Sequence, residues 1–352
     1  MKKIYKSIIC TLSVAAVIGC AKNISESTNS ANKRYLDAWM SINHSGVKAQ
    51  WNNSENEYGI FVIDSEEGTG ATIQKDGYAI VEFTATDLEG NISSYTNKEV
   101  AKQLGVYDTT TYYGPQVWLT TDETIQAGIQ NALVGMKVGG KKTVVIPSWL
   151  MSYKKYTSAK EYFKNTTDYS NTTYYIDVVD YTEDINTWEI DKMKEYMSEY
   201  YGGVDTFKKD TTGFYFKRLS TENGKETAFP SDTTFYINYT GKLLNGLVFD
   251  TNIERVALDN GLYNSSSTYE PVKITWGDDY SEITMGSDGS SVISGFAMTL
   301  WNLRNMNEEG KFDKGVGIFY SPLGYGYSGS GASIPPYAPL VFEIDIVAEP
   351  EE

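Results

Sequence analysis

Two stretches decide the fold: Val292–Met306, VISGFAMTLWNLRNM, and Phe319–Phe342, FYSPLGYGYSGSGASIPPYAPLVF. The first holds a turn of small residues, an aromatic residue and one short apolar helix. The second runs from a strand through a loop of Gly, Ser and Tyr to an Ile-Pro-Pro turn and a last strand. That strand, Phe342–Ile346, alternates apolar with acidic residues, which is typical of a half-buried sheet. Because so short a helix buries little surface alone, a sheet must wrap around it.

The region upstream predicts a further pair of strands. Thr234–Asp250, TFYINYTGKLLNGLVFD, reads as an alternating strand, a turn at Leu244–Gly246 and a return strand that ends in Phe249-Asp250. The inward side of the first strand carries Phe235, Ile237 and Tyr239.

In order and spacing, these motifs resemble the FKBP family of peptidyl-prolyl cis/trans isomerases over roughly 110 residues. The resemblance implies an α+β fold, with an antiparallel sheet wrapped around one short helix. It also implies a proline pocket, whose catalytic residues would be Tyr239, Phe249, Asp250, Val292, Ile293, Phe296, Tyr325, Ile334 and Phe342, with Val272 beside them. Two positions depart from the family pattern, since Phe296 replaces a common Trp and Val272 a frequent aromatic residue. We expect both to affect the rate more than the activity itself.

The chemistry that the resemblance implies requires no general base, metal or cofactor. Rotation about an Xaa-Pro bond faces a barrier of about 18–20 kcal/mol because amide resonance must be broken. An apolar pocket lowers this barrier when it favours the twisted amide over the planar one. By family resemblance, the Tyr325 hydroxyl and the Ile293 N–H donate to substrate carbonyls, and Asp250 is the polar group at the pocket edge.

The chain also repeats itself at an offset near 155 residues. Asp76–Gly90, DGYAIVEFTATDLEG, parallels Asp232–Gly246, and Ile125–Tyr153 parallels the region from Val292 to Tyr325. Thr173–Tyr181 supplies the last strand of the first repeat. We therefore expect two FKBP-like domains in tandem.

The pocket of the first repeat is degenerate. Phe83 takes the place of Tyr239, and Ser93-Ser94 falls where the second repeat has Phe249-Asp250; the other replacements are Gln126, Ile129 and Ser152. We predict that this domain has lost isomerase activity. The alternative is a pocket rebuilt from Tyr95, Tyr112, Tyr113 or Tyr153.

A helix is predicted before each repeat. Asn186–Glu189 has the spacing of a capping box, and Ile190, Met193 and Met197 recur on one face before Gly202-Gly203 ends the helix. Arg34–Asn43 is the upstream counterpart. We expect each helix to cap its own domain; the alternative is an arm that forms a homodimer or holds client proteins.

The N-terminus resembles a bacterial lipoprotein signal. A basic start is followed by the apolar run Ile8–Gly19, which is too short to span a bilayer, and then by Cys20 in a lipobox-like context. Cys20 is the expected lipidation site; the alternative is an ordinary signal peptide with an incidental cysteine. Ala21–Asn32 would be a flexible tether. These features predict an outer-membrane lipoprotein of the cell envelope, facing the periplasm or the exterior.

The composition limits partners and chemistry. A net charge of −16 and an isoelectric point near 4.6 argue against nucleic acid. With one histidine and two cysteines, Cys10 and Cys20, the chain can build neither a catalytic triad nor a disulfide framework. The acidic loops Gly277–Glu282 and Ser287–Gly289 lack the alternation of a calcium-binding loop, so we expect solvated loops.

The expected organisation is a signal peptide over 1–20, a tether and short helix over 21–58, a first domain over 59–182, a linker helix over 183–208 and an isomerase domain over 209–349. The expected function is folding assistance, through prolyl isomerisation by the second domain, to proline-containing unfolded or partly folded envelope proteins. The alternative is a non-catalytic FKBP-like chaperone or binding module.

Overall fold

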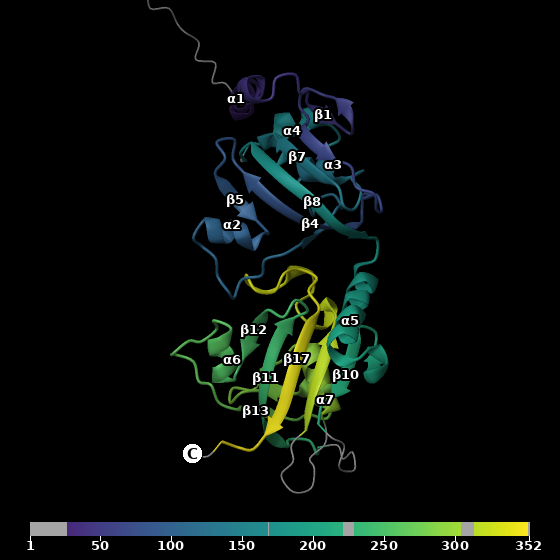
Figure 1. Ribbon diagram of the computed structural model, residues 1–352, viewed down its shortest axis with the longest axis vertical. Coiled ribbons are helices and arrows are strands. Elements are labelled where there is room, and N and C mark those ends of the chain that lie inside the picture. Colours follow the sequence, from purple (N-terminus) through teal and green to yellow (C-terminus); the bar gives the residue numbers. More distant parts are fainter. Residues whose placement is uncertain (1–26, 168, 221–228, 304–312, 351–352) are drawn as a thin grey trace, which may run out of the picture.

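The computed structural model describes residues 27–350, except 168, 221–228 and 304–312. Two α+β domains follow one another along the long axis of the molecule, and helix α5 (Ile185–Tyr201) runs alongside the second (Figure 1). Cys10, Cys20 and the expected signal peptide lie outside the described residues. Within the described part of the chain, none of the helices has the length and apolar character needed to cross a bilayer.

The first domain is built on one antiparallel sheet in the order β3-β7-β8-β4-β5, with β6 also paired to β4. Its strands are β3 (Phe61–Glu66), β4 (Tyr78–Thr86), β5 (Ile92–Tyr95), β6 (Gln116–Leu119), β7 (Lys141–Ile146) and β8 (Thr172–Thr182), beside a small hairpin of β1 (Gln50–Trp51) and β2 (Ser54–Glu55). Its helices are α1 (Thr28–Asn43), α2 (Lys98–Gln103), α3 (Ala127–Leu133) and α4 (Ala159–Asn165).

The second domain repeats this order as β10-β16-β17-β11, with β12 and β13 both paired to β11. Its strands are β9 (Lys208–Thr211), β10 (Phe214–Arg218), β11 (Thr234–Leu243), β12 (Val248–Thr251), β13 (Val272–Thr275), β14 (Thr284–Met285), β15 (Ser290–Ser291), β16 (Lys314–Phe319) and β17 (Leu340–Val347). Besides α5, its helices are α6 (Glu254–Asp259) and α7 (Ser294–Asn302). The matching strand orders confirm the predicted tandem of two FKBP-like folds.

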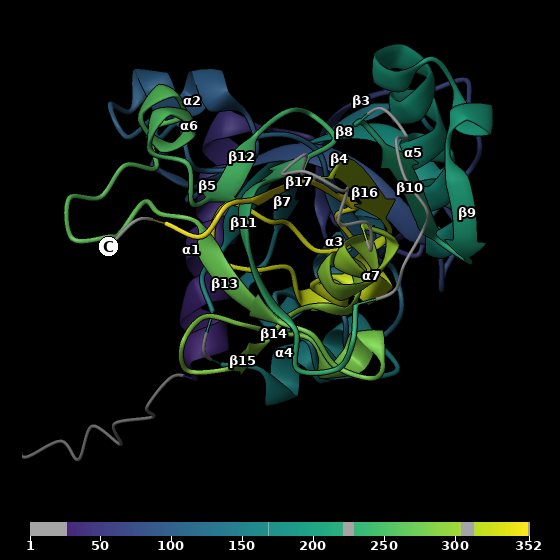
Figure 2. The ribbon, with the colours of Figure 1, turned by 90° about the horizontal axis from the view of Figure 1, so that it is seen from below.

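The sheet of the second domain wraps around α7, as the shortness of that helix predicts. Every second residue of β11 is buried, including Phe235, Ile237 and Tyr239. On β17 the same alternation buries Phe342 and Ile344. Helix α7 packs against β16 and β17, and Figure 2 shows it next to β16. The period of two therefore predicted correctly which face of each strand is buried.

Helix α5 belongs to the second domain. Met193 and Met197 are fully buried against Val316, Ile318 and Val341 of the sheet. The interpretation that this helix caps its own domain is therefore confirmed, and α1 caps the first domain in the same way through Leu36 and Met40.

The capping box predicted at Asn186–Glu189 is wrong. Asp184 is the N-cap of α5, and its carboxylate accepts a hydrogen bond from the Thr187 N–H at 3.2 Å. Glu189 is instead fully buried, and its carboxylate accepts hydrogen bonds from the N–H and the hydroxyl of Ser321, at 2.6 and 2.7 Å. A contact between residues 132 positions apart has replaced the local one.

The flexible tether predicted over Ala21–Asn32 is wrong from Thr28 onward, because α1 begins there. Ser27 caps the helix through its hydroxyl, which accepts from the Ser30 N–H at 3.3 Å. Asn29 is buried, and its amide donates to the carbonyl of Phe163 at 2.6 Å. These bonds to the first domain fix the helix start where polar composition alone suggested a linker.

Candidate active site

Four aromatic side chains of the second domain pack together between α7 and the sheet, at the place where the sequence predicted the proline pocket. Phe296, at the start of α7, meets Phe342 edge-to-face at 5.1 Å and Tyr239 edge-to-face at 5.6 Å. Phe249 of β12 meets Phe342 at 5.5 Å. The structure therefore brings together the ring residues that the sequence predicted. Their interlocking edge-to-face geometry gives a rigid apolar surface.

Tyr239 and Asp250 add a polar edge to this aromatic cluster. The Tyr239 hydroxyl donates to the Asp250 carboxylate at 3.0 Å. Asp250 keeps contact with solvent, yet desolvation by its neighbours raises its pKa, and the Tyr239 hydrogen bond only partly opposes this. Burial, followed by the charge of Asp250, raises the pKa of Tyr239 well above its usual range. At neutral pH the Tyr239 phenol therefore stays protonated and donates its hydrogen bond to the Asp250 carboxylate.

The remaining predicted residues lie on the rim. Ile334 is buried, whereas Tyr325 is 38% exposed. Burial and then the charge of Asp250 raise the pKa of Tyr325, so its hydroxyl stays protonated and able to donate. Val292 and Ile293 pack half-buried against the same core. Among the described residues, the Ile293 N–H makes no main-chain hydrogen bond, which leaves a donor at the start of α7.

Asn252 is a site residue that was not identified from the sequence. It is buried, and its Oδ1 accepts from the Tyr239 N–H at 2.8 Å. Its Nδ2 donates to the carbonyls of Ile237 and Glu270, both at 2.9 Å. Asn252 thus fixes the backbone that carries the Tyr239 ring. Its position two residues after Asp250 was the available signal.

Gly241 is required for the ring packing. A β-carbon at this position would lie 2.7 Å from the Phe249 ring and 2.8 Å from the Phe342 ring. Both distances are shorter than a normal van der Waals contact. The strand therefore needs a residue without a side chain where these two rings cross it.

Strand register confirms the correspondence that was predicted between the two repeats. Gly241 faces Asp250 and Phe342 across the second sheet, and Ala85 faces Ser94 and Tyr174 across the first. Tyr239 and Phe83 lie two residues earlier on their strands. In both domains a buried side chain accepts a hydrogen bond from the backbone N–H at this position. Thr96 accepts from the Phe83 N–H at 2.9 Å, as Asn252 does from the Tyr239 N–H.

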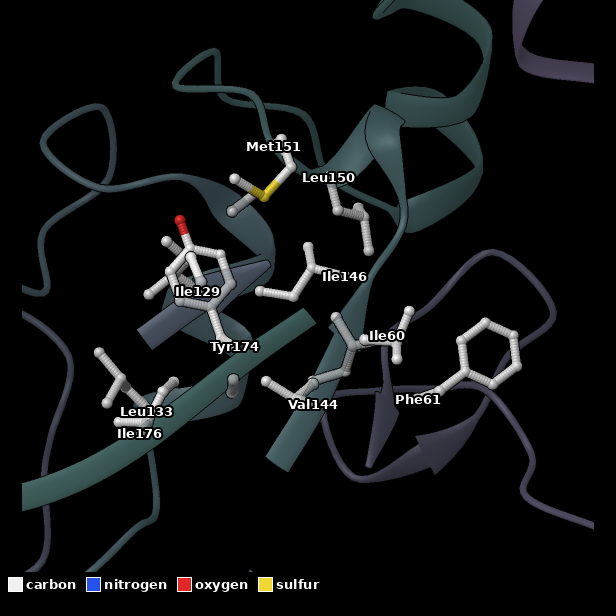
Figure 3. Packing of buried hydrophobic residues seen from close by; sticks show 14 of the residues in the cluster. Ile60, Phe61, Ile129, Leu133, Val144, Ile146, Leu150, Met151, Tyr174 and Ile176 are labelled. Carbon is white, nitrogen blue, oxygen red and sulfur yellow. The ribbon is translucent and has the colours of Figure 1, made fainter. Parts of the chain in front are cut away.

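A cavity of about 500 Å³ lies at the place of the pocket in the first domain. Its walls include Tyr174 and four of the positions at which the sequence predicted a degenerate pocket, Phe83, Ser94, Gln126 and Ile129. Figure 3 labels Ile129 and Tyr174 among the buried residues of this domain.

The rebuilt pocket considered for this domain is present only in part. Tyr153 lines the cavity, whereas Tyr95, Tyr112 and Tyr113 are not among its walls. Trp118 of β6, which the sequence reasoning overlooked, fills the wall instead, with its ring 4.7 Å from that of Phe83.

Residues 224–347 match the model of the family described as FKBP-type peptidyl-prolyl cis-trans isomerase. An FK506-binding protein of Neisseria meningitidis serogroup B is 30% identical over 135 residues, which is 38% of this chain and 94% of that protein. A probable FKBP-type peptidyl-prolyl cis-trans isomerase of Haemophilus influenzae is 29% identical over 153 residues, or 44% of this chain. The chain spans about half the length of that relative, 49%.

The crystal structure of FkpA from Escherichia coli is similar at 22% identity and a TM-score of 0.29, over 46% of this chain and 61% of that one. The assignment rests instead on the family match and the Neisseria relative. This chain belongs to the FKBP-type peptidyl-prolyl cis-trans isomerases.

Proposed function

We propose that this protein is a peptidyl-prolyl cis/trans isomerase whose active site is the pocket of the second domain. The observation that carries the proposal is the convergence of Tyr239, Phe249, Phe296 and Phe342 around the carboxylate of Asp250. The first domain has Phe83 and Ser94 in the places of Tyr239 and Asp250, so it lacks both the hydroxyl and the carboxylate.

The pocket would accelerate rotation by binding the twisted amide more tightly than the planar one. Its aromatic walls hold the pyrrolidine ring and exclude water that would otherwise solvate the more polar planar amide. The Ile293 N–H and the Tyr325 hydroxyl are the donors for substrate carbonyls, and Asp250 lies at the edge where the carbonyl rotates. Each tenfold gain in rate requires about 1.36 kcal/mol, so a few such contacts are sufficient.

The test is an NMR exchange assay on short Xaa-Pro peptides with the full chain. Asp250→Ala is expected to lower kcat/KM at least tenfold. Asp288→Ala changes an exposed loop carboxylate of the same domain, and Ser94→Ala changes the matching position of the first domain; neither is expected to alter the rate. The proposal fails if the full chain gives no acceleration, or if Ser94→Ala abolishes activity and Asp250→Ala does not.

We propose further that the substrates are proline-containing unfolded or partly folded proteins of the cell envelope, and that Cys20 anchors the chain to the outer membrane. The lipobox-like sequence supports this location. Lipid on Cys20 would place the first domain next to the membrane and the Asp250 pocket beyond it. Fractionation of a Cys20→Ser variant is the test, since the variant should leave the membrane fraction after a salt wash. Retention there would mean that lipid on Cys20 is not the anchor.

A further inference from the structure

Residues of the second domain form part of the wall of the first domain's cavity. Pro336 and Tyr337 line it together with Phe83, Trp118 and Tyr174, and Tyr327 stands at the same wall. All three second-domain residues belong to the loop between β16 and β17, which also carries Tyr325 and Ile334. Figure 1 shows this loop, in yellow, between the two domains. A prolyl residue and an aromatic residue of the same chain thus lie at a cavity that corresponds to a proline pocket.

The backbone of this segment has an unusual conformation at Tyr337, which contacts in both domains hold in place. Tyr337 has a φ of 59°, in the left-handed region that bulky residues rarely adopt. Such a conformation persists only when the surroundings determine it. Here the Tyr337 N–H donates to the Gly326 carbonyl at 2.9 Å, and the ring meets Tyr78 of the first domain edge-to-face at 5.5 Å.

The two prolines before Tyr337 reduce the freedom of the segment further. The ring of each proline fixes its own φ, and Pro336 also restricts Pro335 to an extended conformation. Less conformational entropy is therefore lost when the segment binds.

The first domain also contacts the other side of the same loop. The Tyr112 N–H donates to the Ala332 carbonyl at 2.9 Å, and the Tyr112 ring packs against the core of the second domain. Ile334, a predicted pocket residue, lies between Ala332 and Tyr337. The active-site rim is therefore attached to the first domain on both sides of Ile334.

We propose that the cavity of the first domain is a binding site for proline–aromatic segments, and that its resident ligand is the Pro336-Tyr337 segment of the same chain. The cavity has Phe83, Trp118 and Tyr174 in its walls, and it contacts the second domain at the place where the pocket of an isomerase domain would bind substrate. Its role is to hold the loop that carries Tyr325 and Ile334. The role in holding the active-site loop rests on the proposed isomerase function, whereas the binding site itself does not.

The experiment follows the Trp118 indole N–H of the full chain by NMR. Seven tryptophans give seven indole signals, and Trp118→Phe identifies the one that reports on the cavity. Tyr337→Gly removes the ring and suits the positive φ, so the backbone is not strained. Tyr337→Ala is the second deletion variant. Tyr337→Phe keeps the ring, and Tyr280→Ala removes a half-exposed tyrosine elsewhere in the same domain.

We expect both deletion variants to shift the Trp118 signal, while Tyr337→Phe and Tyr280→Ala leave it near its wild-type position. A synthetic peptide of residues 333–339, SIPPYAP, is then added at several millimolar, the effective concentration that a short covalent connection provides. The peptide should shift the Trp118 signal saturably in Tyr337→Gly and should shift it less in the wild type, where the chain's own segment competes.

Three outcomes would overturn the proposal: an unchanged Trp118 signal in both deletion variants, no response to the peptide in Tyr337→Gly, or an equal response in the wild type. The Trp118 signal does not depend on turnover. A chain that shows the expected shifts but no isomerase activity would refute the proposed function and leave this binding site intact.

Discussion

Glu189→Gln should remove a pH dependence of stability that the buried carboxyl imposes on the second domain. Burial raises the pKa of Glu189 from 4.5 to about 7, although the two hydrogen bonds from Ser321 act in the opposite direction. The folded state therefore retains a proton that the unfolded state releases. The stabilisation is complete below pH 4.5 and is lost as the pH rises to about 7.

The size of the effect follows from the two pKa values. Each pKa unit corresponds to 1.36 kcal/mol, so the difference between 4.5 and about 7 amounts to about 3 kcal/mol. For a folding unit of this size, such a loss lowers the melting temperature by roughly 6–12 °C. Glutamine carries no charge and keeps an acceptor for the Ser321 N–H, so Glu189→Gln should lack this loss.

The assay is scanning calorimetry of the full chain between pH 5 and pH 8.5, with attention to the transition of the second domain. The wild type and Glu189→Gln should differ little at pH 5 and diverge above pH 6, with the variant more stable at pH 8. Glu195→Gln, on an exposed position of the same helix, serves as the control and should follow the wild type. Parallel pH profiles for the wild type and Glu189→Gln would refute the reasoning.

Three further predictions concern the pocket. Asn252→Ala leaves the Tyr239 N–H and two carbonyls without their partner, so urea denaturation should show a loss of about 1–3 kcal/mol; an unchanged midpoint would argue against its role in holding β11. Gly241→Ala should cost a similar 1–3 kcal/mol through overpacking against Phe249 and Phe342 and should lower isomerase activity, whereas unaltered activity would mean that these rings can move freely. Tyr239→Phe removes a hydrogen bond that lowers the pKa of Asp250, so the inflection in the pH profile of kcat/KM should move to higher pH; an inflection at the wild-type position would exclude the carboxylate as its source.

The buried faces of the sheet could be predicted from the sequence because they depend on a short-range pattern. The alternation in Thr234–Leu243 and Leu340–Val347 fixes which side chains face the core, and the repeat offset brings Phe83 to the place of Tyr239. The ring residues of the site were implied by the resemblance to the FKBP family, which rests on the order and spacing of the motifs.

Features that depend on contacts between distant residues could not be predicted in the same way. Glu189 fits a capping box by spacing, yet its partner Ser321 lies 132 residues away, and a buried carboxylate with two donors replaces an exposed one at a helix start. Asn252 resembles any polar loop residue until the fold places it under the Tyr239 backbone. Nothing in the sequence indicated that Tyr112 of the first domain packs on the core of the second. Nothing in it indicated that Trp118 lines the cavity of the first domain either.

The Pro336-Tyr337 closure also has a consequence for how the protein is made. A ribosome adds about 5–20 residues per second, and N-terminal domains fold first. The first domain is complete at Thr182, and Tyr337 follows 155 residues later, so roughly 8–30 s of synthesis separate the cavity from the segment that closes it. During that interval Phe83 and Trp118 face water on a nascent chain. Translation speed across the second domain therefore sets how long this apolar surface is open to other proteins.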